Sequence, residues 1–150
     1  MRVGVVSDTH GLLRAEVPPL LAGCDAILHA GDVGAPEVLA RLGELAPVTA
    51  VRGNVDVTGA LARLPEAVEG ELDGAGYRMA HRREDALASP LGDLRLVVFG
   101  HSHRPEVGWH GECLLLNPGS CGPRRFRLPL TLAVLTVAGG RLVPELVAVE

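Results

Sequence analysis

Two short triplets carry residue types that bind metal ions, and each follows directly on a run of strand-like residues. Asp8-Thr9-His10 comes after the apolar run 3–6, and His101-Ser102-His103 comes after residues 96–100. Side chains at positions i and i+2 of an extended chain point the same way, so each triplet can aim two ligand atoms at one point. In α/β proteins, sites are built where strands end. The two triplets therefore indicate a metal centre.

Further polar groups stand at the ends of other strand-like runs. In chain order the set comprises Asp8-Thr9-His10, Gly31-Asp32, Gly53-Asn54, His81, Gly100-His101-Ser102-His103 and Asn117-Pro118-Gly119-Ser120. Chance placement of polar residues would not put every group at a strand end. We therefore interpret the set as parts of one site.

This ordered set resembles the calcineurin-like metallophosphoesterases, whose motifs run D-x-H, G-D, G-N, H and G-H-x-H. The resemblance extends over residues 8–120, and the order makes it specific. Gly53-Asn54-Val55-Asp56 and Asn117-Pro118-Gly119-Ser120 look like the small bacterial and archaeal phosphodiesterases of this superfamily. Those enzymes share their fold with the small scaffold subunit of the retromer sorting complex.

The resemblance implies a centre that holds two divalent metal ions. Two neighbouring cations repel each other unless an anion lies between them, and by analogy with the family Asp32 is the bridging carboxylate. The other implied ligands are Asp8, His10 and His103 for the first metal and Asn54, His81 and His101 for the second. Because the second site contains a neutral amide, we expect it to bind more weakly. Asp32, Asn54 and His101 are also expected to take part in catalysis.

The ligand types narrow the choice of metal. Imidazole and oxygen ligands together favour Mn, Fe, Zn, Co or Ni over Ca or Mg, and the resemblance makes Mn²⁺ the first choice. Such a pair would lower the pKa of a bridging water to give hydroxide and clamp the phosphoryl oxygens during in-line attack. Gly31, Gly53 and Gly100 precede ligands, so they either let the backbone approach the metals closely or are ordinary turn glycines.

Two positions depart from the family pattern. Larger members carry G-N-H-[DE], whose histidine stabilises the transition state or protonates the leaving group, and Val55 stands in its place here. Valine donates no proton, so we expect a slow enzyme that prefers activated diesters to alkyl monoesters. Where the family often has H-G-H, this chain has His81-Arg82-Arg83. Arg82 either alters the backbone or directs its guanidinium at the substrate phosphate, and the resemblance is weakest at His81.

Three further polar residues are interpreted as structural. His29 is expected to pack at a strand end, and Asp56 to be structural or to orient a ligand. His110 is expected in a surface turn over residues 108–111.

Two segments keep alternative readings. Residues 117–120 have the composition of a tight turn, and we expect them also to line the floor of the site. Arg124-Arg125-Phe126-Arg127 is typical of a solvated loop, with a phosphate clamp as the alternative.

The elements that hold these residues alternate at first and later are mostly strands. Strands are predicted over residues 2–7, 26–29, 48–52, 67–72, 77–81, 94–99, 114–116, 132–137 and 142–149. Helices are predicted over 12–22 (with a late start or bend at Pro18 and Pro19), 36–45 and 84–88. The initial βαβαβ order predicts a parallel sheet, and Asp73-Gly74 and Gly139-Gly140 predict turns. The expected fold is α/β, a two-sheet β-sandwich flanked by helices.

Composition excludes several other classes. The 150 residues, 47% of them hydrophobic, suit one domain over residues 1–150. No apolar run approaches the roughly 20 residues of a membrane helix, and no signal peptide precedes the first strand. The net charge of −4 argues against a general nucleic-acid-binding surface. Cys24, Cys113 and Cys121 are widely spaced, so neither a disulfide framework nor a thiolate zinc site is indicated, and we expect a cytoplasmic protein.

The favoured function is metal-dependent hydrolysis of small phosphodiesters. One alternative is a phosphomonoesterase or nucleotidase on the same site, against which Val55 counts. The other is an interaction scaffold like the retromer subunit, with vestigial metal binding. In that relative the equivalents of Asp32 and Asn54 are altered, whereas both keep the phosphoesterase identity here. The physiological substrate, the native metal and the oligomeric state, homo-oligomers included, stay open.

Overall fold

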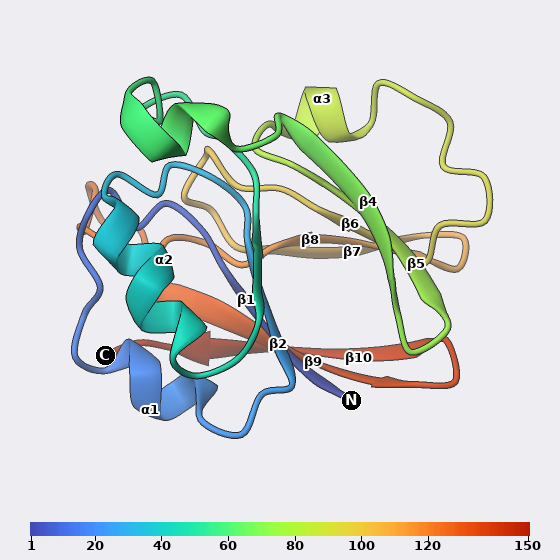
Figure 1. Ribbon diagram of the computed structural model, residues 1–150. Coiled ribbons are helices and arrows are strands. Elements are labelled where there is room, and N and C mark those ends of the chain that lie inside the picture. The colour runs from blue at the N-terminus through green and yellow to red at the C-terminus, as the bar shows by residue number, and fades with distance from the viewer.

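The computed structural model describes residues 1–150 and contains two five-stranded sheets packed face to face (Figure 1). The strands are β1 (Arg2–Val6), β2 (Ala26–His29), β3 (Val48–Ala50), β4 (Ala67–Leu72), β5 (Ala75–Ala80), β6 (Leu96–Val98), β7 (Glu106–His110), β8 (Cys113–Asn117), β9 (Thr131–Ala138) and β10 (Arg141–Ala148). The helices are α1 (Val17–Leu21), α2 (Pro36–Gly43), α3 (Arg83–Ala86) and the short 3₁₀ helix η1 (Gly59–Arg63). The predicted two-sheet α/β sandwich flanked by helices is confirmed.

The first sheet has the strand order β10-β9-β1-β2-β3, and the second has the order β4-β5-β6-β8-β7. In the first sheet β1, β2 and β3 run parallel, as the βαβαβ order predicted, and β9 and β10 are antiparallel to their neighbours. In the second sheet β5, β6 and β8 run parallel. Both predicted hairpin turns are present, between β4 and β5 and between β9 and β10.

The apolar residues form three layers of core. The central layer lies between the two sheets and includes Val5 from β1 and Leu114 from β8. A second layer lies between the first sheet and its helices, where Leu21 of α1 and Leu42 of α2 are fully buried. Burial of each such leucine contributes roughly 1.5–3 kcal/mol. A smaller layer beneath α3 includes Phe99, so both outer faces are covered.

Three local predictions need correction. The first helix is shorter than residues 12–22, but its predicted late start is confirmed, since it begins at Val17 with Pro18 and Pro19 in its first turn. Strand β7 was not predicted, although Val107 and Trp109 alternate with residues that are not apolar. It is a five-residue edge strand in which both apolar side chains are exposed. His110 is exposed but ends this strand, and the turn follows it at residues 111–112.

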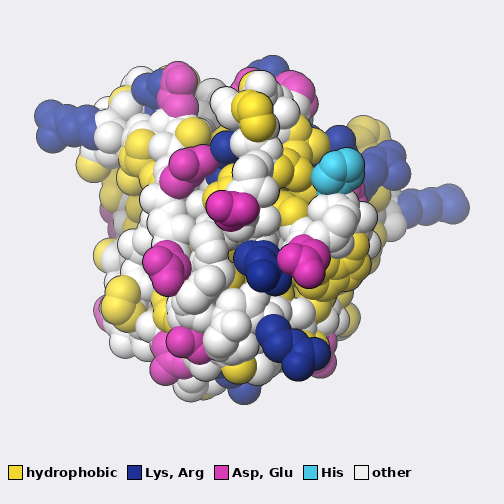
Figure 2. All heavy atoms as spheres, turned by 90° about the vertical axis from the view of Figure 1, so that its right-hand side faces the viewer, with side chains coloured by type: hydrophobic (Ala, Val, Ile, Leu, Met, Phe, Trp, Pro, Cys, Tyr) yellow, Lys and Arg dark blue, Asp and Glu magenta, His cyan; other side chains and the backbone are white.

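Strands from both sheets end on one side of the molecule, where the segments after β1, β2, β3, β5 and β6 carry the polar residues singled out above. The other end, which faces the viewer in Figure 2, shows acidic and basic side chains interspersed among hydrophobic ones. None of the helices has the length and apolar character needed to cross a membrane.

Candidate metal centre

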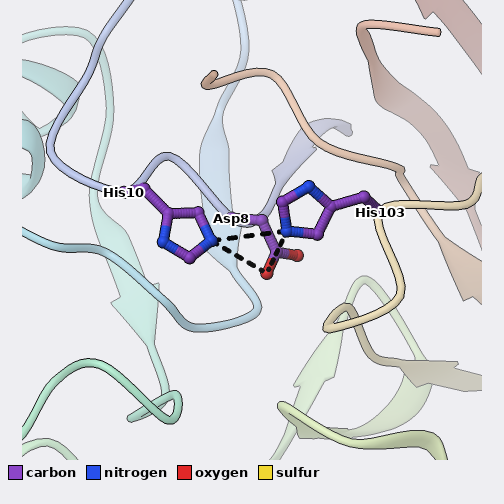
Figure 3. Close-up of side chains that lie close together, drawn as sticks. All are labelled: Asp8, His10 and His103. Carbon is purple, nitrogen blue, oxygen red and sulfur yellow. Dashed lines mark hydrogen bonds and ion pairs between the residues drawn. The ribbon is translucent and has the colours of Figure 1, made fainter. Parts of the chain in front are cut away.

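Six of the seven proposed ligands gather in two adjacent clusters, Asp8 with His10 and His103, and Asp32 with His81 and His101. Within each cluster the candidate ligand atoms all lie within 4.8 Å of one another. In the first, drawn in Figure 3, the Nε2 atoms of His10 and His103 are 3.3 Å apart and both face Asp8. Asp8 Oδ1 lies 3.8 Å from His10 Nε2 and 3.4 Å from His103 Nε2.

The two clusters share a boundary at Asp32. Its Oδ2 atom lies 3.5 Å from Nε2 of His10 in the first cluster and 3.2 Å from Nε2 of His81 in the second. Asp8 Oδ1 in turn lies 3.9 Å from Nε2 of His81. Two carboxylates are therefore surrounded by imidazoles, and the carboxylate of Asp32 occupies the position between the clusters.

The residues present fit divalent metal ions. Asp8 Oδ1 and His81 Nε2 are buried and have no hydrogen-bond partner. A buried polar atom without a partner costs about 1–3 kcal/mol, so such atoms call for an explanation. Both atoms point into the clusters, where a cation would be liganded by them. The donor set of carboxylate oxygen and imidazole nitrogen is one that first-row transition metals accept.

The imidazole of His81 is oriented by the chain itself. Its Nδ1 atom lies 2.7 Å from the carbonyl oxygen of Ala30, to which it donates, so the lone pair of Nε2 is directed toward Asp32. Burial opposes protonation of His81, but the neighbouring carboxylates of Asp32 and Asp8 outweigh it and raise its pKa. Burial likewise opposes ionisation of Asp32, yet the adjacent His81 imidazole and the hydrogen bond from the Val55 N–H hold its pKa below the usual range.

The backbone is left-handed at five of the proposed ligands. The φ angles are 56° for Asp8, 47° for His10, 55° for Asp32, 71° for His101 and 61° for His103. Such angles cost of order 1–2 kcal/mol per non-glycine residue and concentrate at functional sites. The triplets are therefore not extended, contrary to the premise of the sequence argument. Asp8 and His10 still meet, whereas His101 and His103 enter different clusters, so the expectation of one shared point is wrong for that triplet.

The three glycines before ligands are required for two different reasons. Gly31 has φ of +100°, and a Cβ there would lie 2.6 Å from Nδ1 of His81. At Gly53 a Cβ would overlap the backbone and carboxylate of Asp32. At Gly100 it would overlap the Ser7 hydroxyl and lie 2.7 Å from Asp8 Oδ2. Gly31 is thus needed both for its left-handed backbone and for the close packing of a neighbouring side chain. Gly53 and Gly100 are needed only for the close packing of their neighbours.

Neighbouring donors hold the two carboxylates in place. Asp8 Oδ2 accepts hydrogen bonds from the Ser7 hydroxyl at 2.7 Å and from the backbone N–H of His101 at 3.1 Å. Asp32 Oδ1 accepts one from the backbone N–H of Val55 at 3.0 Å. Each carboxylate therefore keeps one oxygen for the clusters. The role of Ser7 was missed by the sequence analysis, and its position beside Asp8 was the only signal.

Asp56 ties together the loops that carry Asp32 and Asn54. Its buried carboxylate accepts hydrogen bonds from the backbone N–H groups of Val33, Gly34 and Gly53 at 3.1, 3.0 and 2.9 Å. It belongs to neither cluster. The structural interpretation of Asp56 is confirmed.

His29 links the loop after β1 to the loop after β2. Its Nδ1 accepts the N–H of Gly31 at 3.1 Å, and its Nε2 lies 3.0 Å from the Thr9 hydroxyl. That hydroxyl donates to the carbonyl of Val33 at 2.8 Å, so Nε2 carries the hydrogen. Burial lowers the pKa of His29 to about 4, and the side chain is a neutral, packed residue as predicted.

Asn54 is the one proposed ligand outside the clusters of histidine and carboxylate. It is exposed and, with His81 and Arg82, lines a pocket of about 370 Å³. The backbone of Arg82 is ordinary extended chain, with φ of −99° and ψ of 141°, so it shows no strain at this position. Its guanidinium lies 3.9 Å from Glu84 at the pocket.

Asn117 supports the loop that carries His101 and His103. Its side-chain amide donates to the carbonyl of Gly100 at 3.1 Å and to the Ser102 hydroxyl at 3.2 Å, and its oxygen accepts the N–H of Gly119. The Ser120 hydroxyl donates to the backbone carbonyl of Asp8 at 2.9 Å. Residues 117–120 thus support the loops of the site, whereas no turn closed by a backbone hydrogen bond is present there.

Comparison with known proteins agrees with this geometry. Residues 1–140 match the family model described as the calcineurin-like phosphoesterase superfamily domain. A probable metallophosphoesterase of Methanothermobacter thermautotrophicus is 34% identical over 98% of this chain and 92% of its own length. Among solved structures, an archaeal phosphodiesterase aligns with a TM-score of 0.80 at 21% identity, covering 98% of this chain and all of that one (100%). Vps29 of Chaetomium thermophilum aligns with a TM-score of 0.79 at 16% identity, covering 98% and 97%.

Proposed function

The chain belongs to the calcineurin-like phosphoesterase superfamily, and from that premise we propose that it is a metal-dependent phosphodiesterase with a binuclear centre. The observation that carries the proposal is the position of Asp32, whose Oδ2 lies within 3.5 Å of a histidine nitrogen from each cluster. A carboxylate in that position can neutralise the repulsion between two cations. We assign Asp8, His10 and His103 to the first ion and Asn54, His81 and His101 to the second.

The residues of the two clusters would hold two divalent cations, which would supply the Lewis acidity that makes water a usable nucleophile near neutral pH and offsets charge on the phosphoryl group. The chain orients the ligands for this task, since Ala30 fixes the His81 ring and Val55 fixes the Asp32 carboxylate. Arg82, at the pocket beside Asn54 and His81, is suited to bind a phosphoryl oxygen. We take Mn²⁺ as the first candidate metal.

A preference for diesters follows from the residue after Asn54. Val55 is 47% exposed and its side chain has no proton to give, while its N–H is used by Asp32. A leaving group must then depart as an anion, which favours activated diesters. A phosphomonoesterase is the weaker candidate for this reason.

The scaffold alternative rests on the likeness to Vps29, which at 16% identity is a likeness of fold. Asp32 and Asn54 are intact and two buried ligand atoms have no hydrogen-bond partner, which argues against a scaffold.

A cytoplasmic setting is supported by the three cysteines, all of which are free and buried.

The proposal is tested by hydrolysis of bis(p-nitrophenyl) phosphate with Mn²⁺ and after chelation. We expect activity that requires metal and falls at least 100-fold in Asp32→Ala, because the cation pair loses its bridge. Asp93→Ala, an exposed residue on the loop before β6, is the matched control and should behave as the wild type. Metal-independent hydrolysis, or full activity in Asp32→Ala, would contradict the proposal.

A further inference from the structure

Phe126 is far more exposed than is usual for an apolar side chain. Its side chain is 93% exposed, and its backbone has φ of +53°. An exposed phenylalanine forgoes the free energy of burial, and a left-handed backbone at a residue with a Cβ adds strain. Together these features indicate a side chain presented to a ligand.

The loop that carries Phe126 leads directly from the metal centre. Ser120, near its start, is hydrogen-bonded to the backbone of Asp8, and the carbonyl of Gly122 accepts a hydrogen bond from Arg14. In Figure 1 this orange loop lies beside the blue segment that follows β1. Phe126 lines a hollow of about 650 Å³ together with Arg104, Arg127 and Leu128. Arg104 directly follows His103, so the hollow is joined to the first cluster through the chain.

The positive charge around this hollow is not compensated. Arg104, Arg125 and Arg127 form no ion pair, whereas the neighbouring Arg124 is paired with Glu150. The pocket beside Asn54 differs, because its arginines, Arg52 and Arg82, face Glu66 and Glu84.

We propose that Phe126, Arg104 and Arg127 form a subsite for the nucleoside part of the substrate, which makes nucleotide diesters the substrate class. The inference rests on the proposed phosphodiesterase function. The flat ring offers a stacking surface that a base uses and an alkyl chain does not, and the arginines are suited to a flanking phosphate. The subsite is local, since the opposite end shows charges of both signs interspersed (Figure 2). A subsite of this size would hold one or two nucleotides. A long nucleic acid is not expected to bind, because the net charge of the protein is −4.

Two diesters with the same leaving group separate the subsite from the chemistry. They are p-nitrophenyl thymidine 5′-phosphate and methyl p-nitrophenyl phosphate, assayed with Mn²⁺. We expect Phe126→Ala to lower kcat/KM about 10- to 100-fold for the thymidine ester, mainly through KM, which is the size of one base–aromatic stack. The methyl ester should change less than twofold. Phe126→Trp should keep kcat/KM for the thymidine ester near the wild-type value. Val143→Ala, which truncates a 64% exposed residue on β10, is the matched control.

Binding of thymidine 5′-monophosphate, measured by calorimetry in the presence of a chelator, tests the subsite even if neither diester is hydrolysed. Absence of hydrolysis would then contradict the proposed function without bearing on the subsite. Weaker binding by Phe126→Ala and by Arg127→Gln supports the subsite. Equal binding by the wild type and Phe126→Ala overturns it, as does an equal loss of both diesterase activities in that variant. Binding to phosphatidylserine vesicles that depends on Phe126, with unchanged nucleotide binding, would overturn it in favour of a membrane contact.

Discussion

The Nε2 atom of His81 lies 3.2 Å from Oδ2 of Asp32, although His81 follows β5 of one sheet and Asp32 follows β2 of the other. The second cluster therefore exists only while the two sheets keep their relative position. That position is set by the apolar layer between them, which includes Val5 and Leu114. Because close-packed interiors deform little, the packing of this layer determines the distance between the two ligands.

Asp32 and Asn54 are expected to affect metal content differently. Asp32→Ala should abolish both metal sites, because the carboxylate that faces both clusters is lost. Asn54→Ala should remove only the second, since Asn54 is assigned to that metal alone and shares a pocket with its ligand His81. Mn²⁺ stoichiometry after equilibrium dialysis checks this. Equal metal content in all three proteins would refute the ligand assignment.

Gly100 and Gly108 make a matched pair for the close approach at the first cluster. Gly100→Ala should destabilise the protein by about 3 kcal/mol, because its Cβ would overlap Ser7 and Asp8. Gly108→Ala should be nearly neutral, since no atom lies within 4 Å of a Cβ there. Urea denaturation of both variants gives the comparison. A tolerated Gly100→Ala would mean that the loop has room to move.

Asp56 should support both stability and the second metal. Asp56→Asn keeps the shape of the side chain but replaces one acceptor oxygen with an NH₂ donor. That donor would face a backbone N–H group that donates to the carboxylate in the wild type. We expect a loss of about 3 kcal/mol in the free energy of unfolding and weaker binding of the second Mn²⁺. Asp93→Asn serves as the control, and unchanged Mn²⁺ affinity in Asp56→Asn would argue against coupling to the site.

His29 should make the metal-free protein less stable in acid. Its pKa falls from 6.5 to about 4 on folding because the side chain is buried. Between these pH values the unfolded chain binds the proton and the folded protein does not, so stability falls as pH is lowered from 6.5 toward 4. The loss at pH 4.5 relative to pH 7 should be about 2–3 kcal/mol larger in the wild type than in His29→Gln. Denaturant titrations with a chelator present measure it, and identical pH profiles would count against His29 as the cause.

Val55 should leave the rate sensitive to the leaving group. Across a series of substituted phenyl phosphodiesters at fixed Mn²⁺ and pH, the rate should fall steeply as the leaving-group pKa rises, because no proton neutralises the departing oxyanion. Val55→His should flatten this dependence if its imidazole reaches the leaving oxygen. A flat dependence in the wild type, with chemistry shown to be rate-limiting, would indicate that another group assists departure.

Several features could be predicted because they depend on neighbours in the chain. The apolar run before Asp8 made β1 recognisable, and Gly139-Gly140 marked the turn of the β9–β10 hairpin. Strand β7 was missed because its alternation involves only two apolar residues, Val107 and Trp109, and an edge strand buries little. His29 and Asp56 were interpreted as structural from the sequence, but their hydrogen-bond partners could not be predicted.

By itself, the sequence determined which residue types stand at the strand ends, since short apolar runs and the glycines after them are local features. The family resemblance already assigned His101 and His103 to different metals, but only the tertiary structure decided how the ligands lie relative to one another. His101 and His103 are two positions apart yet enter different clusters, and Asp8 and Asp32 meet the same two histidine nitrogens from different strands. The physical reason is that left-handed backbone at the ligands redirects side chains away from strand alternation. Such angles persist only where long-range contacts, such as those of Asp56 and Asn117, hold the loops in place.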